Sequence, residues 1–151
     1  MTSHPQKSVL ITGCSAGGIG DSLAKAFAKR NLLVFATARN PKKIDSSLTS
    51  LPNVEVLTLD TTRQSSIAAA VEAVSAKTGG KLDYLVNNAG QGLVSPFLDL
   101  DLEKAKALFD VNFWCVLTAI QAFKHLLVAA KGTIVNTSSI AGVAPNPYES
   151  K

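Results

Sequence analysis

Glycines gather near the amino end of the chain, where an apolar run gives way to a helical pattern. The apolar run predicts a buried strand over residues 8–12, and the spacing of apolar residues predicts a helix over 21–30. Four glycines fall around this junction: Gly13, Gly17, Gly18 and Gly20. Glycine lets the backbone approach a pyrophosphate closely, and a helix amino terminus favours its negative charge. We therefore expect an anion-binding loop; a tight turn alone is the alternative, but it needs fewer glycines.

A basic residue, Arg39, follows a second predicted strand over 32–37. In dinucleotide-binding domains this strand end meets the adenosine ribose, and NAD sites usually place an Asp or Glu there. Residues 36–38 contain no acid, whereas an arginine can stack on adenine and hold a 2′-phosphate. The sequence therefore predicts NADPH rather than NADH as the cofactor, with Ser15 and Asn40 as helpers; a solvated arginine is the alternative.

Two further polar residues stand at places that call for an explanation. Asp60 follows a third predicted strand, over 54–59, where its carboxylate can cap the next helix. Asn112 lies inside a long predicted helix over 102–130, although asparagine is a mediocre helix former. A buried polar role would account for Asn112; an exposed helical asparagine is the alternative.

The predicted elements alternate between strand and helix along the chain. Further strands are expected at 82–86 and 132–136, and further helices at 41–50 and 64–77. Parallel strands need crossover connections, which are right-handed, so helices cover both faces of the sheet. The pattern predicts one α/β domain over 1–151, a doubly wound Rossmann-type parallel sheet with strand order 3-2-1-4-5.

Composition places the chain among ordinary globular proteins. Of its 151 residues 46% are hydrophobic and 17% are charged, and the basic residues behind the net charge of +4 are scattered. A nucleic-acid partner would need a basic stripe with interleaved aromatics, and none is visible. Cys14 and Cys115 have no metal-ligand spacing, so we expect no metal site and a reducing cytoplasmic compartment.

The sequence also bears on membrane association. Residues 1–7 contain no apolar run and therefore predict no secretory signal. We find no run of about 18 apolar residues, the length that a membrane-spanning helix needs. Peripheral contact with a membrane stays open.

The glycine loop resembles that of the short-chain dehydrogenases/reductases, and the likeness extends over residues 7–147. The family's loop reads TGxxxGxG, and this chain carries one extra residue in it. Gly13, Gly18 and Gly20 match the family's glycines, which leaves Gly17 as the surplus residue.

Two later segments add to the resemblance. The sequence Asn-Asn-Ala-Gly at 87–90 matches the family's NNAG motif, whose main task is to stabilise the central strand beside the cofactor ribose. Residues 132–139 resemble the family's fifth strand and its catalytic serine. We assign that serine to Ser139 and regard Ser138 as the neighbouring candidate.

The resemblance implies a cofactor site at the carboxyl edge of the sheet. In the family, the residue that matches Asp60 contacts the adenine amino group, which competes with the capping role. The residues implied to bind NADPH are Gly13, Ser15, Gly18, Ile19, Gly20, Arg39, Asp60, Asn88, Ala89 and Gly90.

The family's mechanism uses a serine that polarises the substrate carbonyl, a tyrosine general acid and a lysine that lowers the tyrosine pKa. The resemblance implies Ser139 for the first role, and Asn112 as the holder of a water in the proton relay. Tyr148 and Lys151 are separated by two residues where the family's YxxxK has three, and Tyr148 follows Ser139 too soon. Compared with the family, we therefore expect this chain to be truncated after its fifth strand, to lack the catalytic tyrosine and lysine, and to be inactive alone.

In motif detail the chain is most similar to fungal NADPH-dependent 1-acyldihydroxyacetone phosphate reductases. The likeness implies an oxidoreductase that reduces a carbonyl of a small molecule such as an acyl lipid, with Gln91, Leu93 and Phe97 as candidates for one pocket wall. It further implies a homodimer for a full-length form, in the cytoplasm or peripheral at the endoplasmic reticulum or lipid droplets. The alternative is a non-catalytic fragment that binds a nucleotide or pairs with a homologue.

Overall fold

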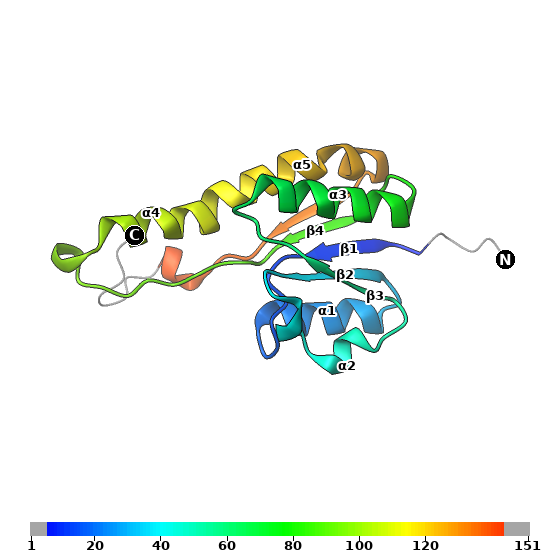
Figure 1. The fold of residues 1–151 in the computed structure, drawn as a ribbon, viewed down its shortest axis with the longest axis horizontal. Helices are drawn as coiled ribbons and strands as arrows, with labels where there is room; N and C mark the ends of the chain where they lie inside the picture. The colour runs from blue at the N-terminus through cyan, green and yellow to red at the C-terminus, as the bar shows by residue number, and fades with distance from the viewer. Residues whose placement is uncertain (1–5, 144–151) are drawn as a thin grey trace.

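The fold is built on a parallel sheet of five strands, seen in a computed structural model that describes residues 6–143 (Figure 1). The strand order β3-β2-β1-β4-β5 confirms the predicted topology. The strands are β1 (Ser8–Ile11), β2 (Leu33–Ala38), β3 (Val54–Thr58), β4 (Tyr84–Asn87) and β5 (Thr133–Asn136). The order reverses between β1 and β4, and doubly wound sheets bind ligands beyond the carboxyl ends of the strands at such a point.

Helices cover both faces of the sheet, as expected. The pair α1 (Ile19–Lys29) and α2 (Ser46–Thr49) lies on one face, and α3 (Gln64–Thr78) and α5 (Cys115–Ala130) lie on the other (Figure 1). Because side chains alternate along a strand, Val9 and Ile11 of β1 pack with α1, whereas Leu10 packs with α3 and α5. Each fully buried aliphatic side chain contributes roughly 1.5–3 kcal/mol, so these layers hold the sheet and its loops in place.

The segment after β2 differs from the single polar helix predicted over 41–50. It forms a short 3₁₀ helix, η1 (Pro41–Lys43), and then α2. The Asn40 side chain accepts a hydrogen bond from the amide of Lys42, and Asp45 accepts one from the amide of Ser47. Two capping residues five positions apart start two separate turns, and this splits the helix.

The long helix predicted over 102–130 is present but not uniform. It consists of α4 (Leu102–Phe109), a π-helical turn η3 (Asp110–Trp114) and α5. By length and composition alone, the 29 residues Leu102–Ala130 could cross a membrane, so our expectation that no segment reaches that length was wrong. Core helices of soluble proteins pass the same test, and α5 packs Phe123 and Leu126 into the core.

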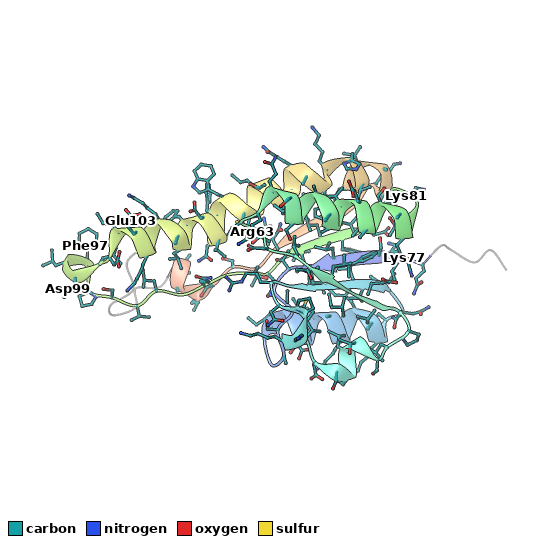
Figure 2. The ribbon with its side chains drawn as sticks, viewed as in Figure 1. Arg63, Lys77, Lys81, Phe97, Asp99 and Glu103 are labelled. Atoms are coloured by element: carbon teal, nitrogen blue, oxygen red, sulfur yellow. The ribbon has the colours of Figure 1, made fainter. Side chains whose placement is uncertain are left out.

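One end of the molecule extends beyond the sheet. Helix α4, together with the chain that leads to it from β4, projects past the carboxyl ends of the strands (Figure 1). Phe97, Asp99 and Glu103 lie at the tip of this projection (Figure 2). Among the residues that the structure describes, β5 forms the sheet edge next to β4, and all four of its residues are exposed.

Candidate functional site

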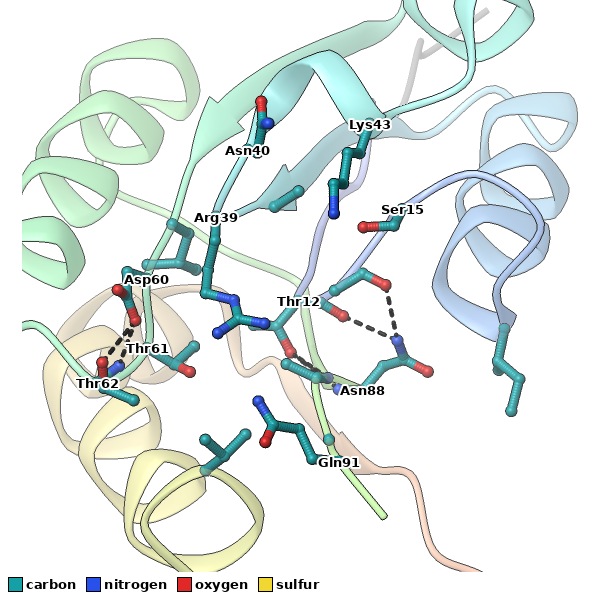
Figure 3. A pocket seen from close by; sticks show the side chains of 17 residues that line it. Thr12, Ser15, Arg39, Asn40, Lys43, Asp60, Thr61, Thr62, Asn88 and Gln91 are labelled. Atoms are coloured by element: carbon teal, nitrogen blue, oxygen red, sulfur yellow. Dashed lines mark hydrogen bonds between the residues drawn. The ribbon is translucent and has the colours of Figure 1, made fainter. Parts of the chain in front are cut away.

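A cavity of about 670 Å³ lies at the carboxyl ends of β1 to β4 (Figure 3). Four loops contribute to it, one after each of these strands. Eight of the ten predicted cofactor-binding residues line it: Gly13, Ser15, Ile19, Arg39, Asp60, Asn88, Ala89 and Gly90. Gly18 and Gly20 do not line the cavity.

The glycine loop packs so tightly that side chains are excluded at two positions. Gly13 has a φ of 77°, and a Cβ there would lie 2.9 Å from the Cα of Ala89. A Cβ on Gly20 would lie 2.4 Å from the carbonyl oxygen of Gly13 and 2.6 Å from Nδ2 of Asn88. Gly20 therefore acts through close packing of α1 against the loop rather than as part of the cavity wall.

The amino terminus of α1 is available to an anion. Its first turn begins after Gly18, which provides no side-chain cap. Uncapped amide groups at a helix amino terminus carry partial positive charge and bind phosphate oxygens. Ile19, the first residue of α1, lines the cavity, so this helix end faces the site.

Thr12 and Asn88 join the glycine loop to the loop after β4. The Thr12 hydroxyl accepts hydrogen bonds from the amides of Asn88 and Ala89, both at 2.9 Å. In return, Nδ2 of Asn88 donates to the carbonyl oxygens of Thr12 at 2.9 Å and Gly13 at 3.2 Å. Asn88 and Ala89 of the NNAG motif therefore tie the loop after β4 to the end of β1, which agrees with the strand-stabilising task that the resemblance implied. Thr12, which opens the TGxxxGxG motif, is a site residue to which the sequence analysis gave no role.

Two cations reach the cavity from the segment after β2. Arg39 and Lys43 both line it, and Lys43 extends toward the side of the cavity where Ser15 lies (Figure 3). The residues before Arg39 at the end of β2 contribute no carboxylate, as the sequence predicted. Asn40 also lines the cavity, but its side-chain oxygen caps η1. Lys43 was not predicted, because it lies four residues beyond Arg39. The turn of η1 returns the chain to the cavity at Lys43.

Asp60 lines the side of the cavity away from Ser15 (Figure 3), and its carboxylate is already hydrogen-bonded to Thr62. Its Oδ1 accepts hydrogen bonds from the hydroxyl of Thr62 at 2.7 Å and the amide of Thr62 at 3.0 Å. The Thr62 hydroxyl holds the pKa of Asp60 below its ordinary value, and Arg63 and Arg39 lower this pKa further. The residue that caps α3 is Arg63, so Asp60 stabilises the turn before that helix and is not its capping residue.

Asn112 does not have the buried environment that we favoured for it. The residue is exposed in the η3 turn, yet its side chain makes two specific hydrogen bonds to the backbone of Gln91. Its Oδ1 accepts from the Gln91 amide at 2.9 Å, and its Nδ2 donates to the Gln91 carbonyl at 2.8 Å. A π-helical turn often marks a functional position, and this one ties the long helix to a loop that lines the cavity.

The catalytic candidates Ser139 and Asn112 do not line the cavity. Ser139 follows β5, is exposed, and accepts a hydrogen bond from the amide of Ala141 at the start of η4 (Ile140–Gly142). Of the expected substrate wall, Gln91 lines the cavity, whereas Phe97 is 73% exposed and lies out on the projection (Figure 2). Tyr148 and Lys151 lie outside the described residues.

Both cysteines are free and buried. Burial raises the pKa of the Cys14 thiol to about 11, and burial also raises the pKa of Cys115. Neither thiol is therefore an activated nucleophile at neutral pH. Within residues 6–143, no group of three or more His, Cys, Asp or Glu side chains is arranged to hold a metal ion.

A doubly wound sheet, a tight glycine loop and a cavity across the switch point together define a dinucleotide-binding domain. The chain matches the family model described as short chain dehydrogenase over residues 7–151. It therefore belongs to the short-chain dehydrogenase family, as its motifs indicated.

Named relatives support this assignment. The chain is 52% identical over 136 residues to the short-chain dehydrogenase ptmH of Penicillium ochrochloron, which covers 90% of this chain and 50% of the relative. It is 44% identical over 140 residues to the NADPH-dependent 1-acyldihydroxyacetone phosphate reductase of Schizosaccharomyces pombe. This match covers 93% of this chain and 47% of the relative. The chain thus spans about half the length of the curated relatives that it matches.

A solved structure agrees in fold. The structure of ElxO with NADP bound superposes with a TM-score of 0.84 at 31% identity, over 95% of this chain and 60% of that one.

Proposed function

We propose that the protein binds NADPH in the cavity at the carboxyl edge of the sheet and reduces a carbonyl group of a small molecule. The observation that carries the cofactor choice is the pair of cations, Arg39 and Lys43, at the end of β2 where NAD-preferring sites place an acid. A 2′-phosphate would interact with both through charge-assisted hydrogen bonds, whereas a 2′-hydroxyl carries no charge for either cation to bind.

The other residues around the cavity fit the rest of a dinucleotide. The uncapped end of α1 and the glycine loop suit the diphosphate, and Ile19, Leu59 and Val111 supply apolar wall for the adenine and ribose. The polar groups of Ser15 and of the backbone at Ala89 and Gly90 complete the lining. When bound there, a reduced nicotinamide cofactor would supply the hydride.

Ser139 and Asn112 are the residues that we assign to the reaction itself. Ser139 uses its oxygen as an acceptor for the Ala141 amide, which leaves its hydroxyl proton available to donate to a substrate carbonyl. Asn112 uses both side-chain groups on Gln91, so any water would be held by its backbone rather than by its amide. The general acid of the proposed reaction would come from outside the described residues.

An acyl lipid ketone is the substrate class that we propose first. The support is the 44% identity to the 1-acyldihydroxyacetone phosphate reductase of S. pombe, together with the motif likeness.

The cofactor proposal is tested by replacing Arg39 with alanine in the full-length protein and titrating NADPH and NADH by fluorescence. A hydrogen bond to a charged group contributes about 1.5–3 kcal/mol, so we expect NADPH affinity to fall roughly 10- to 100-fold. Affinity for NADH should fall much less, because NADH shares the adenine on which Arg39 can stack but has no 2′-phosphate for Arg39 to contact.

The matched control is Arg30→Ala, which removes the same charge at the far end of α1. This variant should bind both cofactors as the parent does. Equal losses for NADPH and NADH in Arg39→Ala would contradict the assignment of the 2′-phosphate to Arg39.

A further inference from the structure

Outside the cavity, three charged side chains join α1 to α2. The Lys25 ammonium lies 2.9 Å from Oδ2 of Asp21, one helical turn before it, and 2.8 Å from Oδ2 of Asp45. The same Asp21 oxygen accepts a hydrogen bond from the amide of Gly17 at 3.2 Å. We infer that Asp21, by accepting the Gly17 amide while paired with Lys25, positions the lengthened glycine loop and thereby sets the affinity for the cofactor, an inference that rests on the function proposed above.

Gly17 is the residue by which this loop exceeds the family pattern. Its φ is 76°, and a Cβ there would meet no atom within 4 Å, so the residue bulges away from the packed part of the loop. It does not line the cavity. Its amide therefore adds nothing to the anion site and is instead held by the carboxylate of Asp21.

Asp21 is suited to holding this loop. It is 3% exposed and lies in the first turn of α1, where the helix dipole favours a carboxylate. Its second oxygen, Oδ1, is buried and has no hydrogen-bond partner among the described residues. All the side-chain bonding of Asp21 that the structure describes is thus directed at Gly17 and Lys25.

The connection continues to the segment that carries the cations. Asp45 caps α2, and the Lys25 ammonium together with the Ser47 amide holds the pKa of Asp45 at about 2. Beside it, the amide of Ala16 donates to the carbonyl oxygen of Lys43 at 2.8 Å. The glycine loop and the segment from Arg39 to Asp45 are therefore tied together at two places, and a shift of the loop would move Lys43 as well.

The charge of Asp21 and its hydrogen bond to Gly17 predict opposite changes in NADPH affinity when the Asp21 side chain is removed. The two roles can therefore be told apart by experiment. Removing a negative charge beside an anion site would by charge alone tighten the binding of NADPH. If Asp21 acts by holding Gly17, its loss must weaken binding instead. Asp21→Ala removes the acceptor and the charge together, whereas Asp21→Asn removes the charge and keeps an acceptor for the Gly17 amide.

The experiment compares these two variants and Glu72→Ala, a control that loses the same charge on α3, in the full-length protein. We expect Asp21→Ala to raise the Kd for NADPH about tenfold, with Asp21→Asn within about threefold of the parent and the control unchanged. In cofactor-free protein, the amides of residues 13–18 should exchange hydrogen faster in Asp21→Ala than in Asp21→Asn. Unchanged or tighter NADPH binding by Asp21→Ala would overturn the inference.

Failure of the inference is distinguishable from failure of the proposed function. If the parent protein binds neither NADPH nor NADH, the proposed function is wrong. The exchange measurement needs no cofactor, so unchanged exchange in Asp21→Ala would show separately that Asp21 does not anchor the loop.

Discussion

Gly20 shows how a single residue decides whether the site can form. The sequence identified it as a cofactor residue by its place in the motif, yet the structure gives it a packing role away from the cavity wall. Sequence spacing marks which glycines matter, but it cannot separate a glycine that admits a ligand from one that admits a neighbouring backbone. Lys43 was missed for a related reason, because a lone lysine carries no spacing that marks it. Thr12 opens the TGxxxGxG motif, but the motif does not show that its hydroxyl accepts the amides of Asn88 and Ala89.

We expect Gly20→Ala to destabilise the protein and to weaken nucleotide binding together. Alanine favours a helix by about 1 kcal/mol over glycine, but overpacking against backbone typically costs 1–3 kcal/mol. Here the Cβ would lie 2.4 Å from the Gly13 carbonyl oxygen, which cannot move without displacing the loop. Thermal unfolding should show Tm lower by roughly 2–8 °C.

Gly92→Ala is the matched control, because a Cβ at Gly92 meets no atom within 4 Å. Its Tm should stay close to that of the parent. A Gly20→Ala protein that melts at the parent temperature and binds NADPH normally would show that α1 can move away from the loop without loss.

At the scale of elements, periodicity predicted which segments are strands and helices but not how each one ends. The five strands follow from short apolar runs, which are properties of local sequence, whereas their order follows from the doubly wound fold that strand–helix alternation indicates. The η3 turn could not be predicted, because it coincides with hydrogen bonds between Asn112 and Gln91, 21 residues away. The division of the segment after β2 into η1 and α2 could have been predicted, since Asn40 and Asp45 are both good capping residues.

Thr12→Val tests the link between β1 and β4. Valine has nearly the same shape, but it leaves the amides of Asn88 and Ala89 without their acceptor in a residue that is only 2% exposed. An unsatisfied buried donor costs about 1–3 kcal/mol, so we expect the free energy of unfolding to fall by roughly 2–4 kcal/mol in a urea titration. Thr12→Ser keeps the hydroxyl and should recover most of the loss; equal losses in both variants would mean that the methyl group matters and the hydroxyl does not.

At the scale of the whole molecule, the described residues leave apolar surface exposed along one side of the long helix. Phe109, Phe113, Trp114 and Leu117 are all exposed large hydrophobic residues there. Patches of this kind on folded proteins usually mark an interaction surface. A homodimer of a full-length form, which the family resemblance implies, would cover such a surface, and nothing in the local sequence of this helix could name its partner.

Trp114, the single tryptophan among these 151 residues, lies on that surface and reports on whether it is covered. It is 56% exposed here and packs edge-to-face on Phe113 with ring centroids 5.0 Å apart. If the full-length protein is a dimer through this face, its tryptophan emission should lie at shorter wavelength and resist acrylamide quenching at high protein concentration. Dilution should then shift the emission to longer wavelength, because dissociation is governed by protomer concentration.

Phe113→Ser should weaken the dimer by at least tenfold while leaving NADPH affinity unchanged, since Phe113 does not line the cofactor cavity. Emission that is red-shifted and easily quenched at every concentration would instead show that the face stays in contact with water.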